Sequence, residues 1–94
     1  MTKSFKDKNT EQLHAGGFVS AFKAFQRQAE KRLRVLDAAD TIDALMLLPS
    51  NRFKALGGDR QGQFNIRIND QWRICFKWHD DSPHDVEIVD YHSR

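Results

Sequence analysis

The sequence is poor in cysteine and has no long apolar run, and both absences exclude classes of protein. Its single cysteine, Cys75, cannot form a disulfide within the chain, so the fold needs no oxidising compartment. No apolar run approaches the roughly 20 residues that a membrane-spanning helix requires. The charged segment 1–6 has no apolar stretch behind it, so it is not a signal peptide. We therefore expect a cytoplasmic protein without a membrane segment.

Motifs for nucleotide and metal binding are also missing. The glycine-rich segment 57–62 lacks the Lys-Ser/Thr pair of a P-loop, so a turn before a strand explains it more simply. Nothing resembles the nucleophile elbow of a serine hydrolase. The histidines show no pairwise spacing typical of a zinc site; they are His14, His79, His84 and His92. We expect no cofactor and no metal ion.

The residues that are present suffice for one globular domain, residues 1–94. The hydrophobic fraction of 39% and the charged fraction of 30% fit an ordinary folded protein, and seven Phe and two Trp can supply its core. The net charge is only +2, but residues 80–94 hold one basic side chain against five acidic ones, so the rest of the chain is basic. On charge alone, a nucleic-acid-binding surface and a mixed solvated surface are equally good interpretations.

Periodicity predicts helices in the first half of the chain. A helical turn is expected over residues 11–14, ended by the glycines that follow it. Thr41 is a good N-cap for a short helix over 42–46, which a proline stops. The strongest pattern predicts a helix over 18–36 whose apolar stripe faces the core. The stripe consists of Phe18, Phe22, Phe25, Ala29, Leu33 and Leu36.

The second half switches to a period of two, which predicts strands. Apolar residues alternate with polar ones over 64–68 and 72–78, and the Asn-Asp pair between these segments is a hairpin signal. A turn over 80–83 leads to a last strand over 86–88, and a weak first strand is expected over 3–8. Together these patterns predict an α+β fold in which two to three helices pack on one face of an antiparallel sheet.

Alternation along the predicted strands divides the sheet into two faces. If Ile66 and Ile74 face the helices, then Arg67, Arg73 and Lys77 project from the uncovered face. Three cations on neighbouring strands would form a platform that binds RNA phosphates. The simpler alternative is that they solubilise an exposed sheet face.

Near its end the chain carries three side chains that can transfer protons or form hydrogen bonds: Asp90, Tyr91 and His92. Histidine titrates near neutral pH, tyrosine can donate a proton, and aspartate can orient an imidazole. Adjacent residues on a strand point to opposite faces, so the three converge only if the chain twists or leaves the strand. A frayed polar tail is the alternative explanation.

Several short motifs become specific when they are considered together. In chain order they are Lys3-Ser4-Phe5-Lys6, Arg32-Leu33, Leu36-Asp37-Ala38-Ala39, Leu56 with Gly58-Asp59-Arg60, Gly62, Trp72-Arg73-Ile74 with Phe76, and Asp90-Tyr91-His92. With these motifs the chain resembles the HigB branch of the RelE/ParE toxin superfamily over almost its full length. The resemblance implies a RelE-like fold and a toxin of a type II toxin–antitoxin system.

The resemblance also implies an activity: a metal-independent endoribonuclease that cuts mRNA on the ribosome and thereby inhibits translation and growth. In such enzymes the 2′-hydroxyl attacks the neighbouring phosphate, leaving a 2′,3′-cyclic phosphate and a 5′-hydroxyl. By the same resemblance Asp90, Tyr91 and His92 are catalytic, and Arg73 clamps the scissile phosphate. Arg60 is implied as a supporting cation, with a turn-fixing ion pair to a neighbouring Asp as the alternative.

Three positions depart from the HigB pattern. The family has His and then Pro before the Leu that leads into Gly-Asp-Arg, whereas this chain has Lys54 and Ala55, and a common Lys before that Gly is Gly57 here. Lys54 can replace the lost imidazole as a phosphate ligand or as a base. We therefore expect a mild or slow toxin, with Lys54 among its catalytic groups.

The partners that the resemblance implies are a helix-turn-helix antitoxin similar to HigA, the 70S ribosome with its mRNA, and operator DNA reached only through the toxin–antitoxin complex. Antitoxin docking on the helical or rim surface would leave the sheet face open. Two other functions remain alternatives. One is a non-catalytic relative that poisons DNA gyrase by protein contact, although such relatives generally lack the terminal acid/base group. The other is a degenerate module that only binds its antitoxin and controls the promoter.

Overall fold

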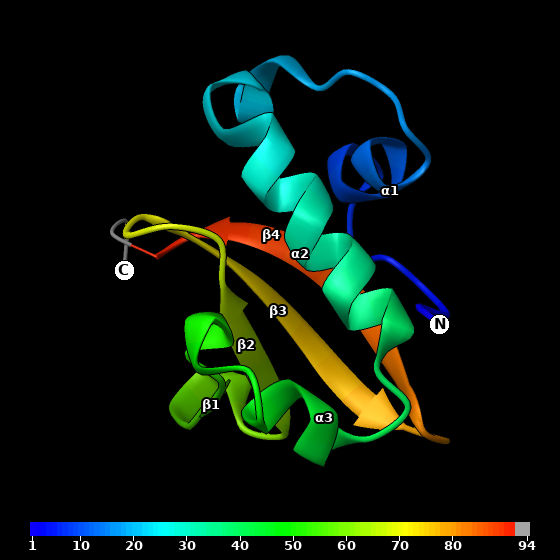
Figure 1. Ribbon diagram of the computed structural model, residues 1–94, viewed down its shortest axis with the longest axis vertical. Helices are drawn as coiled ribbons and strands as arrows, with labels where there is room; N and C mark the ends of the chain where they lie inside the picture. Colours follow the sequence, from blue (N-terminus) through cyan, green and yellow to red (C-terminus); the bar gives the residue numbers. More distant parts are fainter. Residues whose placement is uncertain (92–94) are drawn as a thin grey trace.

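The computed structural model describes residues 1–91, which form a four-stranded antiparallel sheet with helices on one face (Figure 1). The predicted α+β fold is confirmed. Each strand lies beside its neighbour in sequence, in the order β1-β2-β3-β4. The strands are β1 (Lys54–Ala55), β2 (Gln63–Arg67), β3 (Trp72–His79) and β4 (Ser82–Asp90). Within the described residues the helices are α1 (Lys8–His14), α2 (Gln26–Ala38) and α3 (Ile42–Met46), with short 3-10 segments η1 (Ser20–Phe25), η2 (Pro49–Asn51) and η3 (Gly58–Arg60).

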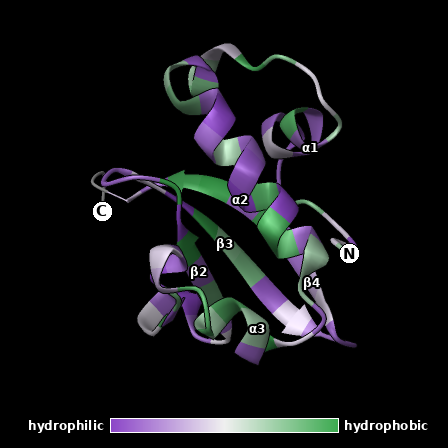
Figure 2. Ribbon diagram, viewed as in Figure 1, coloured by the Kyte–Doolittle hydropathy of each residue, from purple (hydrophilic) through white to green (hydrophobic). Residues whose placement is uncertain are grey.

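Alternation along the strands buries one face of the sheet against the helices. Ile66, Ile74 and Phe76 are fully buried and share one core with Leu33 and Leu36 of α2. Figure 2 shows β4 as largely apolar where it passes behind α2. Burying each large side chain of this kind contributes about 1.5–3 kcal/mol relative to leaving it exposed. Because the helices occupy this face, the opposite face is left to loops and strand ends.

The predicted helix over residues 18–36 is correct only in its second part. The segment η1 is a 3-10 helix, and α2 begins at Gln26. With three residues per turn, Phe22 and Phe25 lie on the same side of η1, and both rings contact Trp72, with centroids 5.9 and 4.8 Å away. Phe18 precedes this segment and is 60% exposed, so its assignment to the core stripe was wrong.

The predicted first strand is also wrong, because the chain turns into a helix too early. The Asp7 carboxylate accepts a hydrogen bond from the Thr10 N–H at 3.2 Å and caps α1, which begins three residues before the predicted turn. The extended residues before it form one isolated parallel bridge, between Phe5 and Val86. The end of α1 is as predicted, since Gly16 supplies the left-handed backbone, with φ of 94°, that follows the helix.

Two hairpins build the larger part of the sheet. In the first, β2 and β3 form the predicted hairpin, with Arg67 opposite Arg73, and the Asn69 side chain accepts hydrogen bonds from the N–H groups of Gln71 and Trp72. In the second, the turn is shorter than predicted: it consists of Asp80-Asp81, both with positive φ, and Ser82 already pairs with His79. Strand β1 was not predicted, because two residues carry no periodic pattern.

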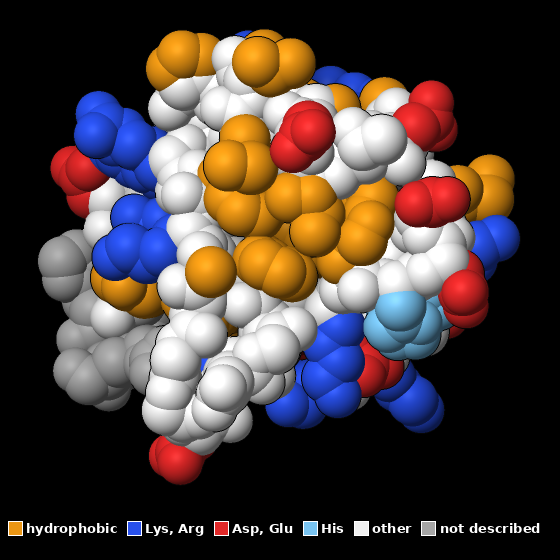
Figure 3. Space-filling model, turned by 90° about the horizontal axis from the view of Figure 1, so that it is seen from below, with side chains coloured by type: hydrophobic (Ala, Val, Ile, Leu, Met, Phe, Trp, Pro, Cys, Tyr) orange, Lys and Arg blue, Asp and Glu red, His pale blue; other side chains and the backbone are white. Residues whose placement is uncertain are grey.

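A row of apolar side chains remains exposed after α3. Met46, Leu47 and Leu48 are between 44 and 79% exposed. Figure 3 shows apolar side chains gathered at the centre of the molecular face seen from below. Concentrated exposed apolar surface is typical of protein–protein contact regions. In the described part of the chain, no helix is both long and apolar enough to cross a membrane.

An ion pair between α1 and the end of α2 makes stability depend on pH. His14 Nε2 lies 2.6 Å from Asp37 Oδ2, and the N–H of Thr2 donates to Asp37 Oδ1 at 3.0 Å. Burial raises the pKa of Asp37, but the hydrogen bonds from Thr2 and His14 lower it by more, so its pKa lies below the ordinary value of 3.8. A carboxyl whose pKa is depressed by folding stabilises the fold above its unfolded pKa, and this contribution is lost as the pH falls through the folded pKa.

We therefore predict that Asp37→Asn lowers the free energy of unfolding at pH 6 but not at pH 2. The loss should be below about 1 kcal/mol, because both side chains are about one third exposed and screened by water. Urea titrations of wild type and variant at both pH values measure it. An equal loss at both pH values would show that the carboxylate charge contributes nothing.

Candidate active site

At one end of the sheet, the uncovered face brings together side chains from β1, β2 and β3 with Tyr91, the residue that follows β4. Strand β2 pairs Asn65 with Lys54 of β1 and Arg67 with Arg73 of β3. Tyr91, directly after β4, joins them because its N–H donates to the carbonyl oxygen of Gln71 at 2.6 Å. This bond continues the β3–β4 pairing by one residue, so that strand alternation directs the phenol ring to the face that carries Arg73.

Tyr91 is the centre of this cluster. The guanidinium carbon of Arg73 lies 4.7 Å from the centroid of the Tyr91 ring, a cation–π contact. On the same ring, the Lys54 ammonium lies 5.9 Å from the centroid and donates a long hydrogen bond, 3.5 Å, to the phenol oxygen. The structure therefore places two cations against one phenol, with Arg73 at the ring and Lys54 at the hydroxyl. We call Lys54, Arg73 and Tyr91 the phenol cluster.

Neutral acceptors hold the Arg73 guanidinium in place. Its Nη1 donates to the side-chain oxygen of Asn65 at 3.0 Å and to the backbone oxygen of Arg52 at 3.4 Å. Arg52 adopts the left-handed backbone, with φ of 48°, after η2, which presents its carbonyl to the sheet. Both acceptors are uncharged, so they orient the guanidinium without neutralising it.

Arg60 lies next to the phenol cluster but is already engaged. Leu56, Gly57, Arg60 and Tyr91 line a hollow of about 320 Å³. Arg60 Nη1 donates to Glu87 of β4 at 2.8 Å and to Gln63 at 3.0 Å. The hydrogen bond to Glu87 raises the pKa of Arg60 above its ordinary value. The expected alternative, an ion pair with a neighbouring Asp, is thus corrected: the partner is a glutamate of the facing strand.

The other two cations of the predicted platform lie on either side of the phenol cluster. Arg67 pairs with the exposed carboxylate of Asp70. Lys77 lies 3.5 Å from Asp85, beyond an irregularity in the β3–β4 register. Arg67 is therefore the direct neighbour of Arg73, whereas Lys77 stands towards the far hairpin.

The chain end is divided between the two faces, as strand alternation requires. Asp90 pairs across the sheet with Trp72, whose ring stacks on Phe25 of the helical layer. The Asp90 carboxylate accepts a hydrogen bond from the Gln71 side chain at 2.9 Å. The structure thus brings Tyr91, but not Asp90, to Arg73. His92, the third predicted catalytic residue, lies outside the described residues.

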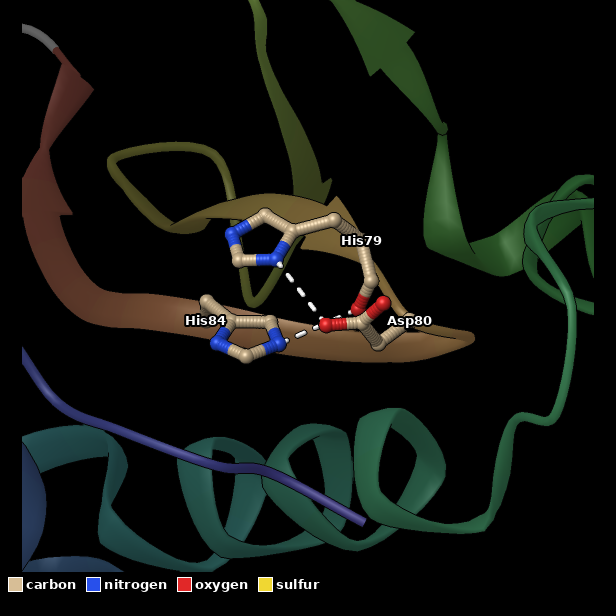
Figure 4. Close-up of side chains that lie close together, drawn as sticks. All are labelled: His79, Asp80 and His84. Carbon is tan, nitrogen blue, oxygen red and sulfur yellow. Dashed lines mark hydrogen bonds and ion pairs between the residues drawn. The ribbon is translucent and has the colours of Figure 1, made fainter.

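Among residues 1–91, one group of three side chains could hold a metal ion. The ligand atoms of His79, Asp80 and His84 lie within 4.8 Å of one another at the tip of the β3–β4 hairpin (Figure 4). Two imidazoles and a carboxylate suit a divalent transition metal. In this conformation, however, the two rings stack at 3.7 Å, and His84 Nε2 lies 3.0 Å from the carbonyl oxygen of His79. The group lies at the opposite end of β3 from Arg73, so it does not serve the phenol cluster.

Comparison with known proteins decides the family. A model described as the RelE-like toxin of the type II toxin–antitoxin system HigB matches residues 3–92. The chain belongs to the HigB-like toxin family. It is 34% identical over 82 residues to Toxin HigB-1 of Vibrio cholerae, an alignment that covers 85% of this chain and 86% of that protein. It is 31% identical over 93 residues to Endoribonuclease HigB of Proteus vulgaris, covering 98% of this chain and 100% of that protein.

As a HigB-like toxin, the protein is half of a two-component system, because a type II toxin has a protein antitoxin as its partner. The family assignment made from the sequence motifs is confirmed. The match extends to residue 92 and so includes Tyr91.

The sequence did not indicate three residues that shape the site: Arg52, Asn65 and Glu87. Glu87 could have been suspected, because a charged residue stands between Val86 and Ile88 on a strand that is otherwise apolar there. The contribution of Arg52 is a backbone oxygen, which leaves no trace in the side-chain pattern. Asn65 looked like a polar residue on a wet face, although the structure buries it completely.

The Arg60–Glu87 pair generates a stability prediction. Glu87→Gln should lower the free energy of unfolding by about 1–2 kcal/mol, because it removes a charged hydrogen bond between two mostly buried side chains. Asp85→Asn is the matched control: it removes the half-exposed pair with Lys77 and should cost less than about 0.5 kcal/mol. Equal losses in urea unfolding would mean that burial does not strengthen the Arg60 pair.

Proposed function

We propose that this HigB-like toxin is an endoribonuclease that cleaves mRNA on the ribosome. The observation that supports it is the phenol cluster, in which Tyr91 lies against Arg73 with Lys54 at its hydroxyl, on the face of the sheet that the helices leave uncovered. Cleavage of an RNA backbone needs a proton acceptor, a proton donor and positive charge at one phosphate. The cluster offers these types of group within a few ångströms.

In the proposed reaction, the 2′-oxygen loses its proton and bonds to phosphorus, and the bond from phosphorus to the 5′-oxygen breaks. The products are a 2′,3′-cyclic phosphate and a 5′-hydroxyl, formed when the leaving oxygen takes up a proton. Arg73 and Lys54 stabilise the charge that gathers on the phosphate oxygens. The phenol of Tyr91, the amine of Lys54 and the imidazole of His92 are the groups that move the two protons. Because the attacking group is a 2′-hydroxyl, DNA is not a substrate.

The role of Lys54 makes the enzyme slow. An ammonium can bind phosphate as well as an imidazolium, but it exchanges protons less readily at neutral pH because lysine titrates far above histidine. Asp90, whose carboxylate accepts a hydrogen bond from Gln71, is assigned to the catalytic group through the family resemblance and fixes the backbone that leads into Tyr91. The replacement of the family's His by Lys54 thus extends the expectation of a mild toxin.

The flanking cations extend the phosphate-binding surface in this proposal. Arg67 and Lys77 pair with carboxylates that are 89% and 48% exposed. Such pairs are worth about 0–1 kcal/mol, so RNA phosphates can replace them. Arg60 adds positive charge beside Tyr91 even while it pairs with Glu87.

The proposed partners follow from the family and from the reaction. The antitoxin is a helix-turn-helix protein similar to HigA, and the toxin reaches operator DNA only in complex with it. The target is the 70S ribosome carrying mRNA, so the toxin acts in the cytoplasm. Docking of the antitoxin on the helical or rim surface would leave the phenol cluster uncovered and would block ribosome entry by bulk.

We predict that Arg73→Ala reduces cleavage of mRNA on translating ribosomes by about 10²–10³-fold, the usual loss for one preorganised donor to a transition state. Tyr91→Phe and Lys54→Ala should each reduce it by at least about tenfold. Lys31→Ala, which removes an exposed cation from α2, is the control and should leave the single-turnover rate within about twofold. Primer extension on the mRNA measures all four rates.

Three results would contradict the proposal. Cleavage at the wild-type rate by all three cluster variants would show that the phenol cluster is not the active site. Growth arrest with intact mRNA and damaged DNA would favour a gyrase poison, whereas promoter repression without any toxicity would favour a module that only binds its antitoxin.

A further inference from the structure

We propose that Asn65 is a positioning residue, whose side-chain oxygen fixes the Arg73 guanidinium against Tyr91 without reducing its charge. The inference rests on the proposed function, because it assigns a catalytic consequence to the contact. It is carried by two features of Asn65: its single hydrogen bond to Arg73, and an amide nitrogen that the fold leaves without a partner.

Asn65 is the buried polar side chain beneath the phenol cluster. It is completely buried in the middle of β2, between Lys54 of β1 and Cys75 of β3. Its Oδ1 accepts from Arg73 Nη1 at 3.0 Å. Its Nδ2 is buried with no hydrogen-bond partner, and so is Nε of Arg73. A buried donor left without a partner costs free energy, which offsets part of the stability that the hydrogen bond to Arg73 contributes.

The second fully buried asparagine shows what a structural asparagine looks like in this protein. Asn51 Oδ1 accepts from Arg32 at 2.7 Å, and its Nδ2 donates to the carbonyl oxygen of Leu45 at 3.0 Å. Both ends of its amide are satisfied, and they join α2 to the segment that follows α3. Asn65 joins no backbone in this way. Its side-chain bond goes to Arg73 alone among the contacts that the structure gives it.

The charge of the acceptor matters as much as its position. A carboxylate at this place would bind the guanidinium more strongly, but it would cancel the charge that the RNA phosphate requires. An amide oxygen orients Arg73 and leaves its full positive charge available. Two neutral acceptors, Asn65 Oδ1 and the carbonyl oxygen of Arg52, therefore aim the guanidinium.

The experiment compares three variants in single-turnover cleavage of ribosome-bound mRNA and in urea unfolding. Asn65→Val should reduce the maximal rate at least tenfold while the unfolding midpoint falls less than in Asn51→Val, because the substitution removes an orphan donor together with the hydrogen bond to Arg73. Asn65→Asp keeps the shape and the acceptor, yet it should also slow cleavage at least tenfold, since it places a negative charge beside the phosphate. Asn51→Val should do the reverse: a lower unfolding midpoint, and a normal rate for the folded protein.

A spectroscopic measurement makes the inference independent of activity. The side-chain ¹⁵N signals of Arg73 should show restricted rotation of the guanidinium in wild type and in Asn65→Asp. In Asn65→Val, free rotation should average the two Nη signals into one. Free rotation in wild type would overturn the positioning role even if the enzyme is active. Cleavage by Asn65→Val at the wild-type rate would overturn its catalytic consequence while leaving the proposed function standing. No cleavage by wild type, with a restrained Arg73, would refute the proposed function and leave the contact intact.

Discussion

The contact between the Tyr91 ring and the Arg73 guanidinium is the interaction on which the rest of the site depends. It joins the chain end to the middle of the sheet, and the centroid distance of 4.7 Å leaves no room for an intervening layer. Backbone geometry makes it possible: the Tyr91 N–H bonds to Gln71, which continues the β3–β4 pairing one residue beyond the strand. Every other member of the site is placed by reference to this pair, with Lys54 at the phenol oxygen and Asn65 under the guanidinium.

Two opposing demands explain why the sheet has such different faces. The core face is filled by aliphatic and aromatic side chains under the helices, and it supplies stability to a chain of only 94 residues. The opposite face carries Arg73, Lys54 and Arg67, with the neutral Asn65 holding Arg73, an arrangement that water tolerates but that gains little for folding. The Glu87 carboxylate on this face is paired with Arg60. Because the helices pack on one side, one small sheet can stabilise the fold with one face and carry the site with the other.

Sequence patterns predicted the parts of this structure that follow from periodicity. The β2–β3 hairpin, the helix over 26–36 and the separation of Ile66 from Arg67 all depend on which face a residue occupies, which alternation determines. The predictions failed where a local contact overrides the pattern. The Asp7 cap starts α1 early, and the stacking of Phe25 on Trp72 accompanies a 3-10 segment that leaves Phe18 outside. In the site, the approach of Tyr91 to Arg73 was expected from family resemblance, whereas the burial of Asn65 and the proximity of His79 and His84 depend on register and on a two-residue turn.

The central claim is that Tyr91 and Arg73 act on the same phosphate as one unit, and a double-mutant cycle tests it most directly. Single-turnover cleavage of ribosome-bound mRNA is measured for wild type, Tyr91→Ala, Arg73→Ala and the double variant. Groups that act together lose most of their effect when either is removed. If the two residues act together, the double variant should be about as slow as the slower single variant. If the double variant instead loses the product of the two single rate losses, Tyr91 and Arg73 act independently, which would contradict their joint action on one phosphate.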